Sequence, residues 1–211
     1  VQLRLSNWEG ALKEFQKLLK NTQALPLYYY AMGVYYHYKM NDDITHGKDI
    51  QQDFAKFLQF HQNARFLAPH FHKAFYAPAQ QYLHLKKPGK ALELLVKIQE
   101  DLKNPELLCL PPFQRRVYRI FFEVTKYPVW IGLSQAYFLL KSYDMALQYA
   151  KIAVKLYPSK GEGYYLQGMI YLFLKNRKEG EKSLKKALSL FPLNSTKRKK
   201  IQKILNKIKK K

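Results

Sequence analysis

The feature that most constrains the fold is a set of eight positions that recur after 34 residues in the last third of the chain. In the first copy these positions are Trp130, Leu133, Ser134, Tyr137, Ala146, Ala150, Ala153 and Pro158. In the second copy they are Tyr164, Gln167, Gly168, Tyr171, Gly180, Leu184, Ala187 and Pro192. A period of this length predicts a stack of helical hairpins, because each copy buries its apolar face against the next one.

Each residue type in the period has a mechanical role. Small residues such as Ser134 and Gly168 let two antiparallel helices approach closely, and the aromatic residues fill the space around them. Pro158 and Pro192 end the second helix of each copy, because proline cannot continue the hydrogen-bond ladder. The length and the pattern resemble the tetratricopeptide repeat family. This resemblance implies an all-α fold, an α-solenoid of helical hairpins that winds as a right-handed superhelix.

The repeat register continues toward the N-terminus with less regularity. Residues 71–105 fit one further repeat, and residues 1–70 fit the pattern weakly. Tyr29, Met32, Gly33 and Tyr36 match a first helix, and Ala64 and Pro69 match the end of a second, but the spacing between them is too long for the repeat by about 12 residues. Turn-forming residues gather there, so we expect an inserted loop near residues 40–49 or a lengthened second helix. The chain opens with Trp8, Ala11, Phe15 and Leu18, which predict a second helix without its partner.

Two segments outside the repeats complete the predicted organisation. Residues 106–126 fit no repeat, but their apolar residues recur at helical spacing, so we expect one extra helix that acts as a spacer. In residues 195–211 an apolar stripe on a basic, amphipathic helix predicts a cap on the last repeat. The predicted domains are therefore the degenerate repeats of residues 1–105, the spacer of residues 106–126, the two regular repeats of residues 127–194, and the capping helix of residues 195–211.

A stack of this type has a concave face that is lined by the first helix of each hairpin. By resemblance to the family, this groove would bind a segment of a partner protein. The groove positions projected onto this sequence are Tyr30, Val34, Tyr38, Tyr76, Gln80, Ile131, Gln135, Phe138, Tyr165, Met169 and Phe173. The same projection also includes Leu27, His37, Lys73, Leu83, His84, Leu139, Glu162 and Leu172.

The predicted lining is apolar and aromatic, which suits an apolar or amphipathic segment held by aromatic anchors. Family members that grip a chaperone carboxylate use Lys, Asn and Arg at such positions. Here Ile131, Gln135, Tyr165 and Met169 occupy them, so that activity is not expected. Two alternatives remain open at this point: the aromatic residues belong to the core, or the chain's own loop or extra helix fills the groove.

The charge is the second strong signal in the sequence. The chain has 37 Lys and Arg against 15 Asp and Glu, a net charge of +22. Nine cations and no acid follow Ser195, and the candidate polyanion-binding residues among them are Lys197, Arg198, Lys199, Lys200, Lys203 and Lys207. Such a cluster attracts an acidic protein, nucleic acid or an anionic membrane. A solvated face on a capping helix explains the same residues.

No sequence motif for catalysis, metal binding or a cofactor is present. Only His70 and His72 have close spacing, and no carboxylate neighbours them in the sequence. The chain is therefore expected to be a non-enzymatic scaffold or adaptor within a larger assembly, with no cofactor and no small-molecule substrate. Self-association through the unpartnered N-terminal helix is a further expectation.

The compartment stays open from sequence alone. The single cysteine, Cys109, excludes a disulfide framework within the chain. No run is long and apolar enough for a transmembrane helix, and no export signal is visible. These features favour a soluble, cytoplasmic protein, while a periplasmic or secreted location after signal removal is also compatible with the sequence.

Overall fold

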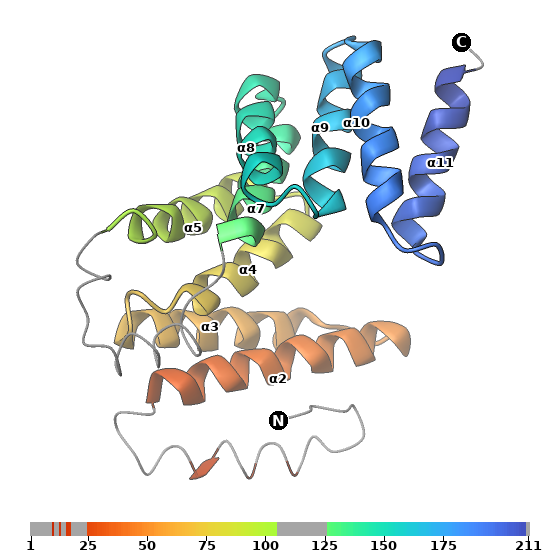
Figure 1. The fold of residues 1–211 in the computed structure, drawn as a ribbon. Coiled ribbons are helices and arrows are strands. Elements are labelled where there is room, and N and C mark those ends of the chain that lie inside the picture. The colour runs from red at the N-terminus through yellow and green to blue at the C-terminus, as the bar shows by residue number, and fades with distance from the viewer. Residues whose placement is uncertain (1–9, 11–12, 14–15, 18–24, 105–125, 210–211) are drawn as a thin grey trace. The chain divides into compact units, whose positions relative to one another are not determined.

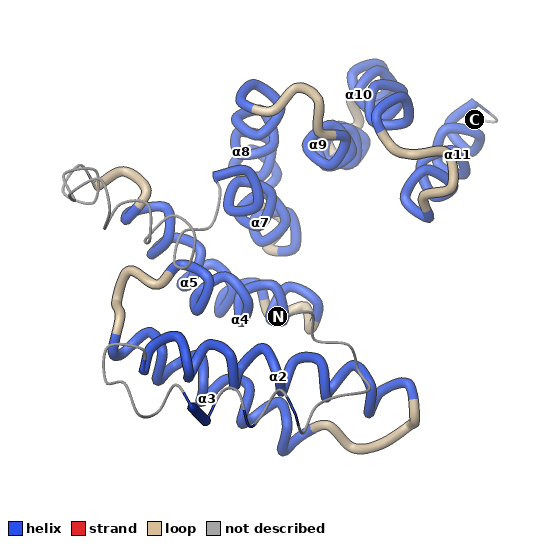
Figure 2. Tube along the Cα trace, turned by 60° about the horizontal axis from the view of Figure 1, so that its bottom comes forward, coloured by secondary structure: helices blue, strands red, loops and turns tan. Residues whose placement is uncertain are grey.

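The computed structural model describes residues 25–104 and 126–209, together with Gly10, Lys13, Gln16 and Lys17. Within these ranges the chain forms nine helices and no strand, which confirms the all-α prediction (Figures 1 and 2). The helices are α2 (Leu25–Thr45), α3 (Gln51–Leu67), α4 (His72–His84), α5 (Pro88–Asp101), α7 (Lys126–Leu139), α8 (Tyr143–Leu156), α9 (Gly161–Phe173), α10 (Arg177–Leu190) and α11 (Thr196–Lys209). The predicted N-terminal helix, the face proposed for self-association and nearly all of the spacer lie outside the described residues.

The chain divides into two compact units that share helices α4 and α5. The first unit comprises residues 1–78 and 97–124, and the second comprises residues 79–96 and 125–211. The division falls immediately after Pro78, a buried proline inside α4 that removes one backbone donor from the helix. The four sequence domains and the superhelix of the whole chain stay predictions.

Helices α7 to α11 stack as successive neighbours in the second unit. Helix α7 packs on α8, α8 on α9, α9 on α10, and α10 on α11. The small residues of the period lie at these contacts. A Cβ atom added to Gly168 would come within 2.7 Å of Leu184 Cγ, and one added to Gly180 within 2.8 Å of Leu172 Cδ2. The buried Ser134 hydroxyl donates to the Ala146 carbonyl oxygen across 2.9 Å. The recurring small residues therefore mark close helix approach, as predicted.

The capping role of α11 is visible in its apolar stripe. Ile201 and Leu205 are buried in one cluster with Leu184 and Ala187 of α10, and Ile204 and Ile208 pack against it. Prolines follow the second helices as expected, with Pro158 after α8 and Pro192 after α10. Sequence patterning therefore predicted the α7–α11 stack correctly.

The turns within the three hairpins of the second unit share one unusual geometry. Lys86, Lys141 and Lys175 have left-handed backbone conformations, with φ of 54°, 62° and 61°. In the α7/α8 turn the Lys141 N–H donates to the Phe138 carbonyl oxygen, and the Ser142 N–H donates to that of Tyr137, both at 3.0 Å. The same pair of bonds recurs around Lys86 and Lys175. This is the Schellman motif, whose left-handed residue is usually glycine.

The α2/α3 hairpin of the first unit is built differently. Helix α2 continues through Asn41, Asp42 and Asp43 to Thr45, so the predicted loop near residues 40–49 is reduced to residues 46–50. Asp43 is buried and accepts ion pairs from Lys39 at 3.3 Å and Lys48 at 3.2 Å. Lys39 also pairs with Asp53 of α3. These pairs hold the acidic residues in helical conformation and override their preference for turns.

Candidate functional site

A hollow lies between the C-terminal halves of α4 and α7 in the second unit. It measures about 250 Å³ and is lined by Gln80, Leu83 and His84 of α4 and by Gln135, Phe138 and Leu139 of α7. The two triplets occupy equivalent positions of neighbouring hairpins. The sequence projection therefore selected residues that share a surface, although equivalent members lie 55 positions apart in the chain.

An aromatic cluster of two half-buried rings, Phe138 and Tyr143, and one exposed ring, Phe173, adjoins this hollow through Phe138. The Phe138 and Phe173 rings meet edge to face at 4.9 Å, and the Tyr143 ring stacks on Phe173 at 5.6 Å. The Phe138 and Tyr143 ring centroids are 5.7 Å apart. Phe173 keeps 54% of its surface exposed, which is high for so large an apolar side chain. We call the hollow and this cluster the groove surface: Gln80, Leu83, His84, Gln135, Phe138, Leu139, Tyr143 and Phe173.

The other groove candidates of the second unit differ in how far neighbouring helices cover them. Ile131 is buried, with 6% of its surface exposed, so the structure corrects its assignment to an accessible groove. Tyr165 packs against the cluster formed by α10 and α11. Met169 is half-buried on α9, at the position equivalent to Gln80 and Gln135. A helical period places these side chains on one stripe, but it does not say which of them the next helix covers.

The remaining candidates lie in the first unit. Tyr30 packs against His61 and Phe71, with ring centroids 5.6 and 4.9 Å apart, and burial raises its pKa. Val34 and Tyr76 are half-buried, and Tyr38 is exposed. Tyr30 is therefore a packing residue in this structure, which agrees with the alternative that the aromatic residues belong to the core.

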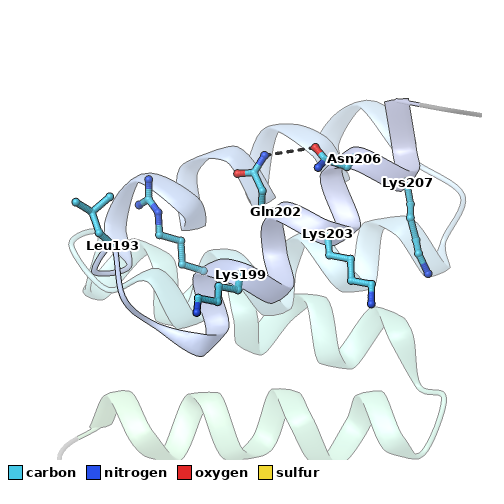
Figure 3. A pocket seen from close by; sticks show the side chains of 7 residues that line it. Leu193, Lys199, Gln202, Lys203, Asn206 and Lys207 are labelled. Atoms are coloured by element: carbon cyan, nitrogen blue, oxygen red, sulfur yellow. Dashed lines mark hydrogen bonds between the residues drawn. The ribbon is translucent and has the colours of Figure 1, made fainter.

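The basic helix α11 presents a second surface. A shallow hollow of about 540 Å³ is lined by Leu193, Arg198, Lys199, Gln202, Lys203, Asn206 and Lys207 (Figure 3). Lys199, Lys203 and Lys207 follow one another at four-residue spacing and extend on one side of the helix. Gln202 donates to Asn206 at 3.4 Å. Cations line this surface, and helix α11 itself contains no carboxylate.

Two of the predicted polyanion-binding cations are engaged within the fold. Lys197 pairs with Glu162 and lies over the Phe191 ring at 5.9 Å. Arg198 donates to the carbonyl oxygens of Leu188 at 2.5 Å and Phe191 at 3.0 Å, at the end of α10. These interactions fasten the cap, because a cation stabilises the C-terminal carbonyls of a helix. Lys199, Lys200, Lys203 and Lys207 stay exposed.

The family comparison agrees with the repeat geometry. A model of the tetratricopeptide repeat matches residues 127–160 and 161–192. Residues 127–192 are two tetratricopeptide repeats. The tetratricopeptide repeat is a scaffold for protein–protein interaction, and nothing in the described residues points to catalysis. A search of the curated proteins found no match.

Solved structures share the fold of the chain at low sequence identity. One is titled as the crystal structure of PilW, a widely conserved type IV pilus biogenesis factor. It has a TM-score of 0.69 and 12% identity, covering 97% of this chain and 79% of that one. MamA from Desulfovibrio magneticus RS-1 has a TM-score of 0.62 and 16% identity, covering 89% of this chain and 88% of that one. At such identities the likeness shows only a shared fold of stacked helical hairpins.

The histidine pair has a structural partner that the sequence did not reveal. The buried Asp101 carboxylate lies 3.1 Å from His70 Nδ1, 3.4 Å from His72 Nε2 and 3.3 Å from Lys97 Nζ. Because α4 and α5 form an antiparallel hairpin, the start of α4 lies beside the end of α5. The hairpin pattern of the repeat is therefore the sequence signal that could have predicted this contact. Burial lowers the pKa of His72, although Asp101 opposes that shift. In residues 25–104 and 126–209 no group of three or more His, Cys, Asp or Glu could hold a metal ion.

The described helices also bear on membrane insertion. None of α2 to α5 or α7 to α11 combines the length and the apolar character that crossing a bilayer requires.

Proposed function

We propose that the second unit binds an apolar or amphipathic segment of a partner protein on its groove surface, as part of a larger assembly. The Phe138–Tyr143–Phe173 cluster, in which Phe173 is exposed and the other two rings are half-buried, lies beside the hollow and carries this proposal. Aromatic side chains next to a preformed hollow supply most of the affinity in helix-in-groove recognition. The interaction role of the tetratricopeptide repeat supports the same function.

A peptide-display selection against the wild-type chain tests this function and does not require an identified partner. Peptides that emerge would be measured against Phe173→Ala and Leu139→Ala, two exposed positions whose truncation leaves the core intact. Loss of an aromatic hot spot corresponds to about a 30-fold weaker affinity. We expect a loss of that order for Phe173→Ala and a smaller one for Leu139→Ala.

The matched control is Leu156→Ala, because Leu156 is also exposed, at 51%, but belongs to α8 and not to the groove surface. Its affinity for the selected peptides should equal that of the wild type. An equal loss in the control and the Phe173 variant, or no loss in either, would overturn the groove assignment.

A second candidate function is polyanion binding by α11. The hollow lined by Lys199, Lys203 and Lys207 favours it, since three adjacent ammonium groups can neutralise neighbouring phosphates. Changing the three to Gln should weaken binding to a DNA duplex and to phosphatidylserine vesicles. The slope of log affinity against log salt should also become shallower by about 3 units on DNA.

The charge-matched control for this function replaces Lys151, Lys155 and Lys160, which are exposed on and after α8. If that control lowers the affinity as much as the α11 variant, the binding reflects net charge alone, and the α11 site is refuted. The DNA and vesicle arms separate nucleic acid from membrane as the source of phosphate.

A further inference from the structure

The left-handed lysines lie directly beside the groove surface. Lys86, Lys141 and Lys175, which we call the rim lysines, each follow by two residues a member of that surface: His84, Leu139 and Phe173. All three rim lysines are exposed. Because the hollow joins the ends of α4 and α7 and the Phe138–Phe173 contact joins the ends of α7 and α9, the three turns lie along one edge of the second unit.

Lysine is an unexpected residue in this conformation. A left-handed backbone suits glycine, whereas a residue with a Cβ atom is strained there. The chain nevertheless places lysine in all three turns. A cation near a helix C-terminus gains some stability from the helix dipole, and this alternative must be separated from a binding role.

The charges around the rim are predominantly positive. Within the described part of the chain none of the rim lysines forms an ion pair with a carboxylate. Lys87 adds a cation in the α4/α5 turn, and the first turns of α5 and α10 add Lys90, Lys178 and Arg177, the last of which donates to the Ile208 carbonyl oxygen of α11. The carboxylates closest in sequence, Asp144 and Glu179, lie in the first turns of α8 and α10, where the helix dipole favours them. The groove surface thus has a floor in which Leu83, Phe138 and Leu139 lie among Gln80, His84 and Gln135, and it has a cationic edge.

We infer that the segment bound by the groove surface is an acidic amphipathic one, whose apolar side chains enter the hollow and whose carboxylates face the rim lysines. This inference rests on the proposed function and specifies the chemistry of the partner. Charge complementarity carries it, because an apolar segment flanked by Asp or Glu matches both the floor and the edge.

The test combines two peptides with one set of variants. The probe is a synthetic amphipathic peptide with Leu and Phe on one face and Glu on the other, and its counterpart carries Gln in place of Glu. The triple variant Lys86→Gly, Lys141→Gly and Lys175→Gly removes the charges and relieves the left-handed strain. We expect the Glu peptide to bind the wild type about 10-fold more tightly than it binds this variant, as a set of exposed ion pairs would give. The Gln peptide should bind both proteins equally.

Folding and binding respond in opposite directions in this design. The triple Gly variant should unfold at a higher urea concentration than the wild type while it binds the Glu peptide more weakly. A triple Lys→Arg variant should retain the affinity for the Glu peptide. The control with Lys151, Lys155 and Lys160 changed to Gln should bind the Glu peptide as tightly as the wild type, apart from the uniform effect of its lower net charge. If the Gly variant instead unfolds at lower urea with unchanged affinity, the lysines serve the helix dipole, and the inference is refuted.

The remaining outcomes separate this inference from the proposed function. Equal affinity of the wild type for the Glu and Gln peptides, with loss in Phe173→Ala, would overturn the acidic partner and keep the groove. Binding of neither peptide, together with phosphatidylserine vesicle binding that the Gly variant loses, would assign the rim to a membrane and overturn both.

Discussion

The α2/α3 hairpin of the first unit and the α9/α10 hairpin of the second achieve close helix contact by different chemistry. In α9/α10 the contact is glycine against glycine, since Cβ atoms added to Gly168 and Gly180 would lie 3.1 and 3.2 Å from each other's carbonyl oxygen. In α2/α3 a Cβ atom on Gly33 would lie 2.2 Å from the buried ring of His61. In α9/α10 the two glycines face each other's backbone and apolar leucine side chains, whereas in α2/α3 the glycine faces a titratable ring.

This difference predicts that the two units respond differently to a fall in pH. The α9/α10 contact contains no group that changes charge near neutral pH. The α2/α3 contact places His61 in an apolar environment, with Nδ1 held 2.8 Å from the Phe57 carbonyl oxygen. The same architecture can therefore be stable to acid in one unit and sensitive in the other.

The largest expected effect comes from filling the glycine contacts. Gly33→Ala should lower the free energy of unfolding by about 3 kcal/mol, because the buried His61 ring has no room to move. Gly168→Ala should cost roughly 2 kcal/mol, since Leu184 can shift partly. Urea denaturation measures both. In a His61→Ala background the cost of Gly33→Ala should shrink; an unchanged cost would show that the ring does not set it.

Acid should destabilise the first unit selectively. Burial lowers the pKa of His61 to about 4, so between pH 6.5 and 4 the unfolded chain binds a proton that the folded chain does not. The free energy of unfolding should therefore fall by roughly 3 kcal/mol as the pH drops through this window, and the change should level off below it. His72 contributes in the same direction.

Amide hydrogen exchange resolves this effect by unit. Lowering the pH from 7 to 4, after correction for the intrinsic rate, should speed exchange in α3 and leave α10 unchanged. The His61→Gln variant should lose most of the pH dependence. Equal acceleration in α3 and α10 would contradict the assignment of acid sensitivity to the first unit.

Substitutions in the turns should give the smallest changes in the free energy of unfolding, and the two changes should have opposite signs. The α2/α3 turn uses Gly47 at φ 69°, with no atom near enough to touch an added Cβ, whereas the α7/α8 turn uses Lys141 at φ 62°. Gly47→Ala should therefore lower the free energy of unfolding by about 1 kcal/mol, and Lys141→Gly should raise it by a similar amount. Urea midpoints of the two variants, compared with wild type, check the pair. Shifts of the same sign would refute the conformational explanation.

The regular part of the fold could be predicted from sequence because its period carries packing information. Gly168 and Gly180 recur where helices touch, and Pro158 and Pro192 recur where they end. The length of α2 could not be predicted in this way. Asp43 has the local preference of a turn residue, yet it is helical and pairs with Lys39 and Lys48, contacts that the local sequence preference does not include.

The groove surface was partly predictable for the same reason. Helical spacing predicted Gln80, Gln135, Phe138 and Phe173, which the structure brings to one surface. It could not reveal that α10 and α11 cover Tyr165, because that contact depends on the angle between neighbouring helices. Tyr143 and the rim lysines were also missed, since Tyr143 begins a second helix and the lysines belong to turns, whereas the groove projection sampled only the first helices.

The most direct test of the central claim is hydrogen exchange of the full chain with and without a display-selected peptide. We predict slower exchange at the ends of the first helices of the second unit, over residues 80–87, 135–143 and 169–176, with α11 and α3 unchanged. Protection confined to α11, or to the first unit, would contradict the assignment of partner binding to the groove surface.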